Sequence, residues 1–132
     1  MASGLYRSGR NEIARGLSLV ASPLAFVLVA PGYVPDFEVD ATQGDIYNDY
    51  QIAEAPITGK TIDSALHFLA DDTTFPDMVS GDTVGGVVMI RDTGEVGTSR
   101  LIAYFTGPDF PIMSNGEPFV VQGSITSGIL AF

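Results

Sequence analysis

The hydrophobic pattern is clearest between Val84 and Tyr104. Two apolar runs rich in β-branched residues flank a polar segment that contains two glycines. This arrangement predicts a strand, a turn and a second strand. The first run is almost continuously apolar, which indicates that both of its faces are covered. We therefore expect this hairpin to form the middle of a sheet.

Shorter runs predict the remaining strands, over 24–30, 51–56, 61–70, 111–114, 119–123 and 125–132. The run 24–30 is apolar throughout and is expected to be central as well. Residues 61–70 alternate, which is typical of one half-buried strand. Asn115-Gly116 is a strong two-residue turn signal, so the runs on either side of it are expected to pair as a hairpin. In the polar connection over 71–82, Phe75 is expected to be an apolar anchor.

One helix is expected, between Ser8 and Ala21. Ser8 or Asn11 is its expected N-cap, and Glu12 is expected in the first turn, where the helix dipole favours a negative charge. Its apolar stripe would consist of Ile13, Leu17 and Val20. Gly16 weakens the helix, so packing is needed to hold it.

These elements predict a mainly β fold: an antiparallel β-sandwich or barrel of about seven to eight strands with one N-terminal helix laid on one side. Strands and helices do not alternate as they do in a parallel sheet. We expect a single domain over 1–132, divided into an N-terminal arm (1–10), a helix (11–21) and a β-body (22–132).

The composition suits a folded protein that works by contact. Apolar residues make up 45% of the 132 residues and charged residues only 17%, the opposite of the balance found in disordered chains. So low a charge fraction suggests that partners cover part of the surface. Cysteine is absent, which excludes disulfides, thiolate metal sites and a cysteine nucleophile.

The charge is −10 overall and unevenly spread. Residues 1–15 hold three arginines against one glutamate, whereas the remainder holds three cations against fifteen carboxylates. An acidic body repels nucleic acid and anionic lipid, so neither is an expected partner. The basic arm either docks on an acidic neighbour, such as a second copy of the chain, or is a solvated tail. The residues expected at such an interface are Leu5, Tyr6, Arg7, Arg10 and Arg15.

Residues 1–32 resemble a secretory signal, with a basic start and an apolar run. Glu12 in the charged region and Pro23 in the apolar run argue against one. No run reaches the roughly 18 apolar residues that a membrane span needs.

Asp92-Thr93-Gly94 is the sharpest chemical motif. Aspartic proteases pair two copies of this triplet around one water, and a dimer would supply two copies. Arg91 would pair with Asp92 and lower the pKa of that carboxyl, and no second glycine motif supports the active loop. The triplet is also what a hairpin turn requires, which is the interpretation we favour.

The other motifs are weaker evidence for a chemical function. Gly59-Lys60-Thr61 resembles the end of a phosphate loop, but Glu54 stands where the first glycine belongs, so a turn is expected. The acidic run 36–40 fails the calcium-loop spacing and is expected to be a solvated loop. His67 is the only histidine and is expected on a strand face. We therefore predict no catalytic, cofactor-binding or metal-binding residue, no small-molecule substrate and no enzymatic activity.

Three segments in order carry a family resemblance: Ile57 to Thr61, Asp71 to Phe75, and the hairpin formed by Val87 to Gly94 with Ser99 to Tyr104. With the N-terminal helix, the apolar strand after it and the acidic loop, this order resembles a group of small virion proteins of tailed bacteriophages. Members of that group are usually left without a function or are placed as capsid cement (decoration) proteins.

The resemblance implies a structural protein on the exterior of the virion, made in the cytoplasm of the host bacterium. Its implied partners are the major capsid protein and further copies of itself, as a dimer or trimer. It supplies no catalytic residue. The alternatives are a head–tail neck or tail component, the dimeric aspartic protease at Asp92, and a carbohydrate- or receptor-binding β-module with exposed aromatic residues around one concave face.

Overall fold

A computed structural model describes residues 4–18, 20–62, 67–76, 78, 80–106, 110–121 and 130–131. The helices are α1 (Arg7–Ala14) and the single-turn α2 (Gly44–Tyr47). The strands are β1 (Gly4–Leu5), β2 (Leu24–Val29), β3 (Gln51–Pro56), β4 (Thr61–Ile62), β5 (His67–Leu69), β6 (Thr73–Phe75), β7 (Thr83–Val84), β8 (Gly86–Arg91), β9 (Arg100–Phe105), β10 (Ile112–Met113), β11 (Phe119–Val121) and β12 (Leu130–Ala131). The predicted fold class, mainly β with a helix near the N-terminus, is confirmed.

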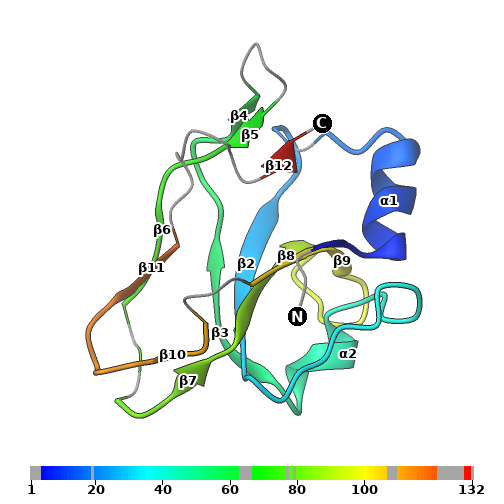
Figure 1. The fold of residues 1–132 in the computed structure, drawn as a ribbon. Coiled ribbons are helices and arrows are strands. Elements are labelled where there is room, and N and C mark those ends of the chain that lie inside the picture. The colour runs from blue at the N-terminus through cyan, green and yellow to red at the C-terminus, as the bar shows by residue number, and fades with distance from the viewer. Residues whose placement is uncertain are drawn as a thin grey trace.

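The core of the fold is a five-stranded antiparallel sheet with the order β1-β9-β8-β2-β3 (Figure 1). The predicted hairpin is its β8–β9 pair, and β8 is the central strand, as expected. Every residue of β2 is buried, which confirms the prediction for that apolar run. The remaining described strands form three smaller antiparallel sheets, and the described strands do not close into a barrel.

Both faces of the central sheet are covered, because alternate residues of β2 and β8 point to opposite sides. One face packs Phe26 and Met89 against residues that include Phe68, Phe75 and Val84. The opposite face packs against a second cluster, made of Tyr6, Ala25, Val27, Val29, Tyr33, Ile46, Val88, Ile90, Leu101 and Tyr104. Burial on both sides explains why these strands are apolar without interruption.

Two pairings differ from the sequence-based expectation. Thr61 and Ile62 pair with Leu69 and Phe68, so this region is a folded-back pair of strands and not one long strand; 63–66 lie outside the described residues. The Asn115-Gly116 turn is present, with Gly116 at a φ of 86°, but its flanks do not pair with each other.

Instead, β10 pairs with β7 and β11 pairs with β6. Together these four strands make a bent, two-stranded ribbon on the side of the molecule away from α1 (Figure 1). Phe75 of β6 is buried, which confirms it as the anchor of this connection. Of the expected last strand, the described part is β12, which pairs with β5.

The N-terminal segment docks on β9 of its own chain. β1 pairs with Ala103 and Tyr104, and the register of β9 shifts at Ile102, which is a β-bulge. The Ile102 carbonyl oxygen accepts the Tyr6 amide at 3.0 Å, which continues the β1–β9 register by one residue. Residues 4–10 of the expected N-terminal arm are therefore part of the fold, as β1 and the first turn of α1.

Helix α1 is shorter than predicted. Gly16 has a φ of 100° and forms a Schellman ending, in which the Leu17 amide bonds to Glu12 and the Gly16 amide to Ile13. Leu17 and Val20 therefore lie beyond the helix, and Val20 is exposed. The expected apolar stripe along the helix is wrong, because Gly16 ends the helix before the stripe is complete.

The start of α1 also differs from the prediction. Tyr6 occupies the N-cap position and no side chain caps the helix. Ser8 instead donates its hydroxyl to the Leu101 carbonyl oxygen at 2.6 Å, and the Arg7 amide bonds to the Phe37 carbonyl oxygen. Since α1 begins at Arg7, Glu12 lies in its second turn and not in its first.

Candidate protein interface

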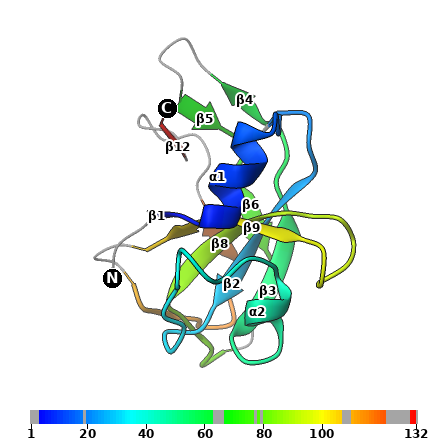
Figure 2. The same ribbon diagram turned by 90° about the vertical axis from the view of Figure 1, so that its right-hand side faces the viewer.

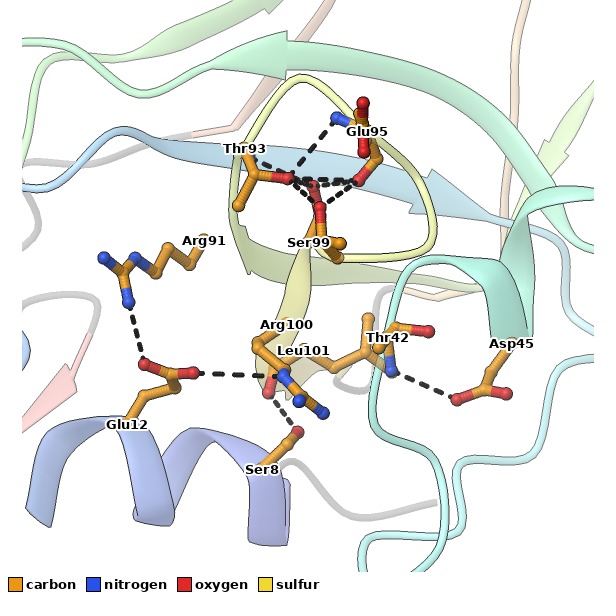
Figure 3. Close-up of polar contacts among 11 residues, drawn as sticks. Ser8, Glu12, Thr42, Asp45, Arg91, Thr93, Glu95, Ser99, Arg100 and Leu101 are labelled. Carbon is orange, nitrogen blue, oxygen red and sulfur yellow. Dashed lines mark hydrogen bonds and ion pairs between the residues drawn. The ribbon is translucent and has the colours of Figure 1, made fainter. Parts of the chain in front are cut away.

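Five of the six cationic residues of the chain gather around α1. Arg7, Arg10 and Arg15 lie on or next to the helix, Arg91 ends β8 and Arg100 begins β9. We call these five residues the arginine patch. Arg91 and Arg100 are direct partners in the β8–β9 register, so the hairpin delivers two positive charges to the same place as the helix (Figure 3).

Glu12 connects the parts of the arginine patch. Its carboxylate lies 2.9 Å from Arg91 Nη1 and 4.0 Å from Arg100 Nε, and Figure 3 shows both side chains reaching toward it. Two like charges opposite each other in a sheet repel, and Glu12 offsets that repulsion. Arg91 was expected to pair with Asp92, and this is wrong, because the helix supplies the nearer carboxylate.

Three of the residues expected at an interface, Arg7, Arg10 and Arg15, lie on the surface as such a role requires. Tyr6 does not: its side chain is 0% exposed, so an interface role for it is wrong. Its ring fills the core because the N-terminal segment folds onto its own sheet. Leu5 is half-buried in β1 and packs against the core.

Sequence reasoning missed Arg91 and Arg100 as members of this patch. Long separation along the chain hides their proximity to α1, since Arg91 is 79 positions from Glu12. A signal was present in the predicted hairpin, because pairing its two strands places both arginines at one end. An unpaired set of like charges there calls for a carboxylate from elsewhere.

Beside the arginine patch lies an acidic segment, residues 34–49, which we call the acidic loop. It holds Asp36, Glu38, Asp40, Asp45 and Asp49, of which all but Asp40 are exposed. It also carries three of the exposed large apolar side chains of the described surface, Val34, Val39 and Tyr47, with exposed fractions of 69%, 72% and 47%. The acidic loop therefore combines negative charge with apolar surface.

The carboxylates of the acidic loop organise its backbone. Asp36 accepts hydrogen bonds from the amides of Glu38 and Val39 at 3.2 Å. Asp45 accepts the Ala41 amide at 2.8 Å. It also accepts the Thr42 amide at 3.1 Å (Figure 3). Among the described residues, no three acidic or histidine side chains come close enough to hold a metal ion. Asp36 and Asp45 thus serve as acceptors for the backbone of their own loop.

The arginine patch and the acidic loop meet at a cavity of about 180 Å³. Its lining consists of Arg7, Ser8, Asn11, Glu12, Arg15, Glu38, Asp40, Ala41 and Arg100. Arg10 crosses the same boundary and binds Glu38 at 2.9 Å, with both side chains about half or more exposed. The cavity thus lies on the boundary between a positive and a negative surface and is lined mainly by polar residues. We call this boundary the seam.

Beneath the seam, a chain of hydrogen bonds connects the core to the acidic loop. Tyr33 donates its hydroxyl to Asp40 Oδ2 at 2.8 Å, and the Tyr6 and Tyr33 hydroxyls lie 2.7 Å apart. Because the Tyr33 hydroxyl hydrogen is directed at Asp40, Tyr6 is the hydrogen-bond donor to Tyr33. Burial raises the pKa of both tyrosines well above the ordinary value, since it disfavours the charged form. Both side chains therefore stay neutral at ordinary pH.

The candidate protease motif forms a hairpin turn. Asp92 accepts the Gly94 amide at 2.9 Å, and Gly94 has a φ of 85°. Thr93, Glu95 and Ser99 are hydrogen-bonded within the same loop (Figure 3). The turn interpretation is confirmed, and the Asp92 carboxylate is engaged by its own backbone.

The second glycine motif is also a turn. Gly59 has a φ of 64°, and the Lys60 ammonium group donates a hydrogen bond to the Ser22 carbonyl oxygen. A Cβ on Gly59 would collide with the Asp71 carboxyl group, at 2.4 Å. His67 lies in β5, as a strand position was expected for it.

The β-module alternative requires several exposed aromatic residues around a concave face. Tyr47 is the exposed aromatic side chain of the described surface. The others take part in the core or in ring pairs such as Tyr33–Tyr50 and Phe75–Phe119. The described surface therefore lacks the set of rings on which a sugar would stack.

No described helix is long and apolar enough to cross a bilayer. Comparison with protein-family models, with curated proteins and with solved structures finds no match. A function for the chain is therefore argued from its sequence, its fold and its surface chemistry.

Proposed function

We propose that this chain is a structural virion protein of a tailed bacteriophage, a capsid cement protein that stabilises the head by binding the major capsid protein. The family resemblance of its ordered motifs supplies the class. The observation that carries the proposal is the separation of charge on the surface, with five of six cations in one patch on an acidic body. Such a surface orients a protein on its neighbours.

Two further features support a role by contact. Large apolar side chains are exposed on opposite sides of the fold: Val39 in the acidic loop, and Met113 and Val120 on the ribbon. The two motifs that resemble catalytic or phosphate-binding sequences, at Asp92 and Gly59, form turns. Many copies of such a part, each with a modest interface, together reinforce a shell.

Quantitative mass spectrometry of purified virions tests the proposal. A cement protein is expected in an amount comparable to that of the major capsid protein. A neck component would instead be present in the few copies of a single ring. Absence from purified virions would overturn a structural role of either kind.

Binding to empty heads is a second, direct test. Heads from phage lacking this protein should bind the purified chain until saturated and should then resist heat or chelation better. The variant Glu117→Lys, on an exposed turn of the ribbon, probes whether the ribbon side faces the shell. Saturable binding without any gain in head stability would argue against cementing.

A further inference from the structure

We infer that the face bearing α1 and the acidic loop binds a second copy of the same chain across a twofold axis. The axis would pass through the seam cavity, so that the arginine patch of each copy covers the acidic loop of the other. The inference builds on the proposed function, because it names the partner of the same face. It commits to a symmetric dimer as the unit of assembly.

The two halves lie on one side of the molecule. Figure 1 places both helices at the right, and Figure 2 looks onto that side, with α1 in its upper half and α2 in its lower half. The cavity lining includes residues from both halves, Arg7 and Arg15 from one and Glu38 and Asp40 from the other. A single face therefore carries adjacent regions of opposite charge.

Such a face is complementary to itself. A twofold rotation about the seam exchanges its halves, so each positive half meets a negative half and both contacts form at once. A head-to-tail arrangement would need two separate complementary faces. The described residues show opposite charges concentrated side by side on this one face, which favours the isologous arrangement.

The charges of the face are only partly satisfied within one copy. Arg10 is paired with Glu38, and Arg91 with Glu12. Arg7 and Arg15 have no ion pair with another described residue, and Asp49 in the acidic loop is exposed and likewise unpaired among them. These residues are the ones available to a second copy.

Exposed apolar side chains of the acidic loop supply the remaining contact. Val34, Val39 and Tyr47 are 47% exposed or more, and burial of such side chains is what stabilises protein interfaces. They stand in the acidic loop, so a dimer would place them against the aliphatic stems of the partner's arginine patch. Arginine stems and a tyrosine ring are common interface contacts.

Sedimentation velocity on the isolated chain tests the inference. Wild-type protein should be dimeric at an ionic strength of about 0.1 M and should dissociate toward about 1 M, where the Debye length falls from about 10 Å to about 3 Å. A monomer at low salt, or a dimer indifferent to salt, would overturn the inference.

Charge reversal in each half sharpens the test. The pair Arg7→Glu and Arg15→Glu should weaken the dimer at least about a hundredfold. Asp49→Lys, combined with a new positive charge at the neutral, exposed neighbour through Asn48→Lys, should do the same. Glu117→Lys, which lies away from this face, should leave it intact. Circular dichroism and thermal unfolding establish that each variant is folded.

Mixing the two reversed variants is decisive. In each variant the substituted positions of one half carry the same sign as the other half, so self-pairing is weakened, whereas a mixture of the two variants brings opposite charges together and should form heterodimers. If only the arginine variant dissociates, or the mixture fails to pair, the twofold arrangement is wrong. A monomer in solution would overturn the dimer and leave the virion assay to decide the proposed function. If the protein is a dimer in solution but is absent from virions, the dimer stands and the proposed virion function is overturned.

Discussion

Gly9 of α1 lies directly against the backbone of Ile102 in β9. A Cβ on Gly9 would be 2.2 Å from the Ile102 carbonyl oxygen and 2.7 Å from its Cα. The helix therefore packs against the bulge of the strand through Ser8 and Gly9, the small residues of α1 that are buried. This close approach fixes the position of the whole arginine patch relative to the acidic loop.

Gly9→Ala should destabilise the fold by about 1–3 kcal/mol or more, because the added methyl meets backbone atoms that cannot rotate away. Urea unfolding monitored by circular dichroism measures the loss. Gly97→Ala is the matched control, since nothing lies within 4 Å of its added Cβ, and it should stay within about 0.5 kcal/mol of wild type. Equal effects of the two substitutions would contradict the close packing of α1 on β9.

Tyr33→Phe should cost about 1–3 kcal/mol, because it leaves the buried Tyr6 hydroxyl without its acceptor. Tyr6→Phe removes only a donor to Tyr33, which keeps its bond to Asp40, and should cost about 0.5–1.5 kcal/mol. Unfolding free energies of both single variants and the double variant give the coupling. A smaller loss for Tyr33→Phe than for Tyr6→Phe would refute the direction assigned to the chain.

Stability should fall as the pH rises above about 10. The pKa of Tyr6, Tyr33 and Tyr104 is raised from the ordinary 10.0, chiefly because burial disfavours the tyrosinate. Above pH 10 the unfolded chain therefore releases protons that the folded chain retains, and this favours unfolding; below it the stability is fully present. Unfolding at about pH 9 and about pH 11 measures the decline.

Ultraviolet absorbance at high pH gives an independent check. The chain has five tyrosines, and the buried ones should ionise only when the protein unfolds. The double variant Tyr6→Phe and Tyr33→Phe should lose less stability between the two pH values than wild type. A single tyrosine transition near the ordinary value in folded protein would contradict the burial of these hydroxyls.

Glu12→Gln should cost up to about 1 kcal/mol, since Glu12 is partly buried and faces two arginines. Glu38→Gln breaks a more exposed pair with Arg10 and should cost close to nothing, which makes it the matched control. Both losses are measured by urea unfolding, and the Glu12 effect should shrink with added salt. A larger loss for Glu38→Gln would refute the central place of Glu12.

Asp92→Ala should weaken the hairpin turn by about 0.5–1.5 kcal/mol, through loss of the bond to the Gly94 amide. Asp92→Asn retains a side-chain oxygen acceptor and should stay closer to wild type. Peptide cleavage should be absent in wild type and in both variants. Activity in wild type that disappears in Asp92→Asn would revive the protease alternative.

Some of this molecule could be predicted from local patterns. The continuous apolar runs at 24–30 and 87–90 predicted the central strands, because a strand buried on both faces has no polar side. Asp92-Thr93-Gly94 and Gly59-Lys60-Thr61 predicted turns, because a glycine with positive φ is a local requirement. The division of charge between the N-terminal residues and the rest predicted an interface at the N-terminal arginines.

Tertiary structure alone decided the rest, because it depends on contacts between segments distant in sequence. The strands around Asn115-Gly116 pair with β6 and β7 instead of each other, and Tyr6 enters the core because the segment before α1 pairs with β9. Arg91 and Arg100 join the helix arginines only after β8 and β9 pair beside α1. Local sequence fixes backbone conformation and apolar faces, whereas the choice among possible partners is made by packing across the whole chain.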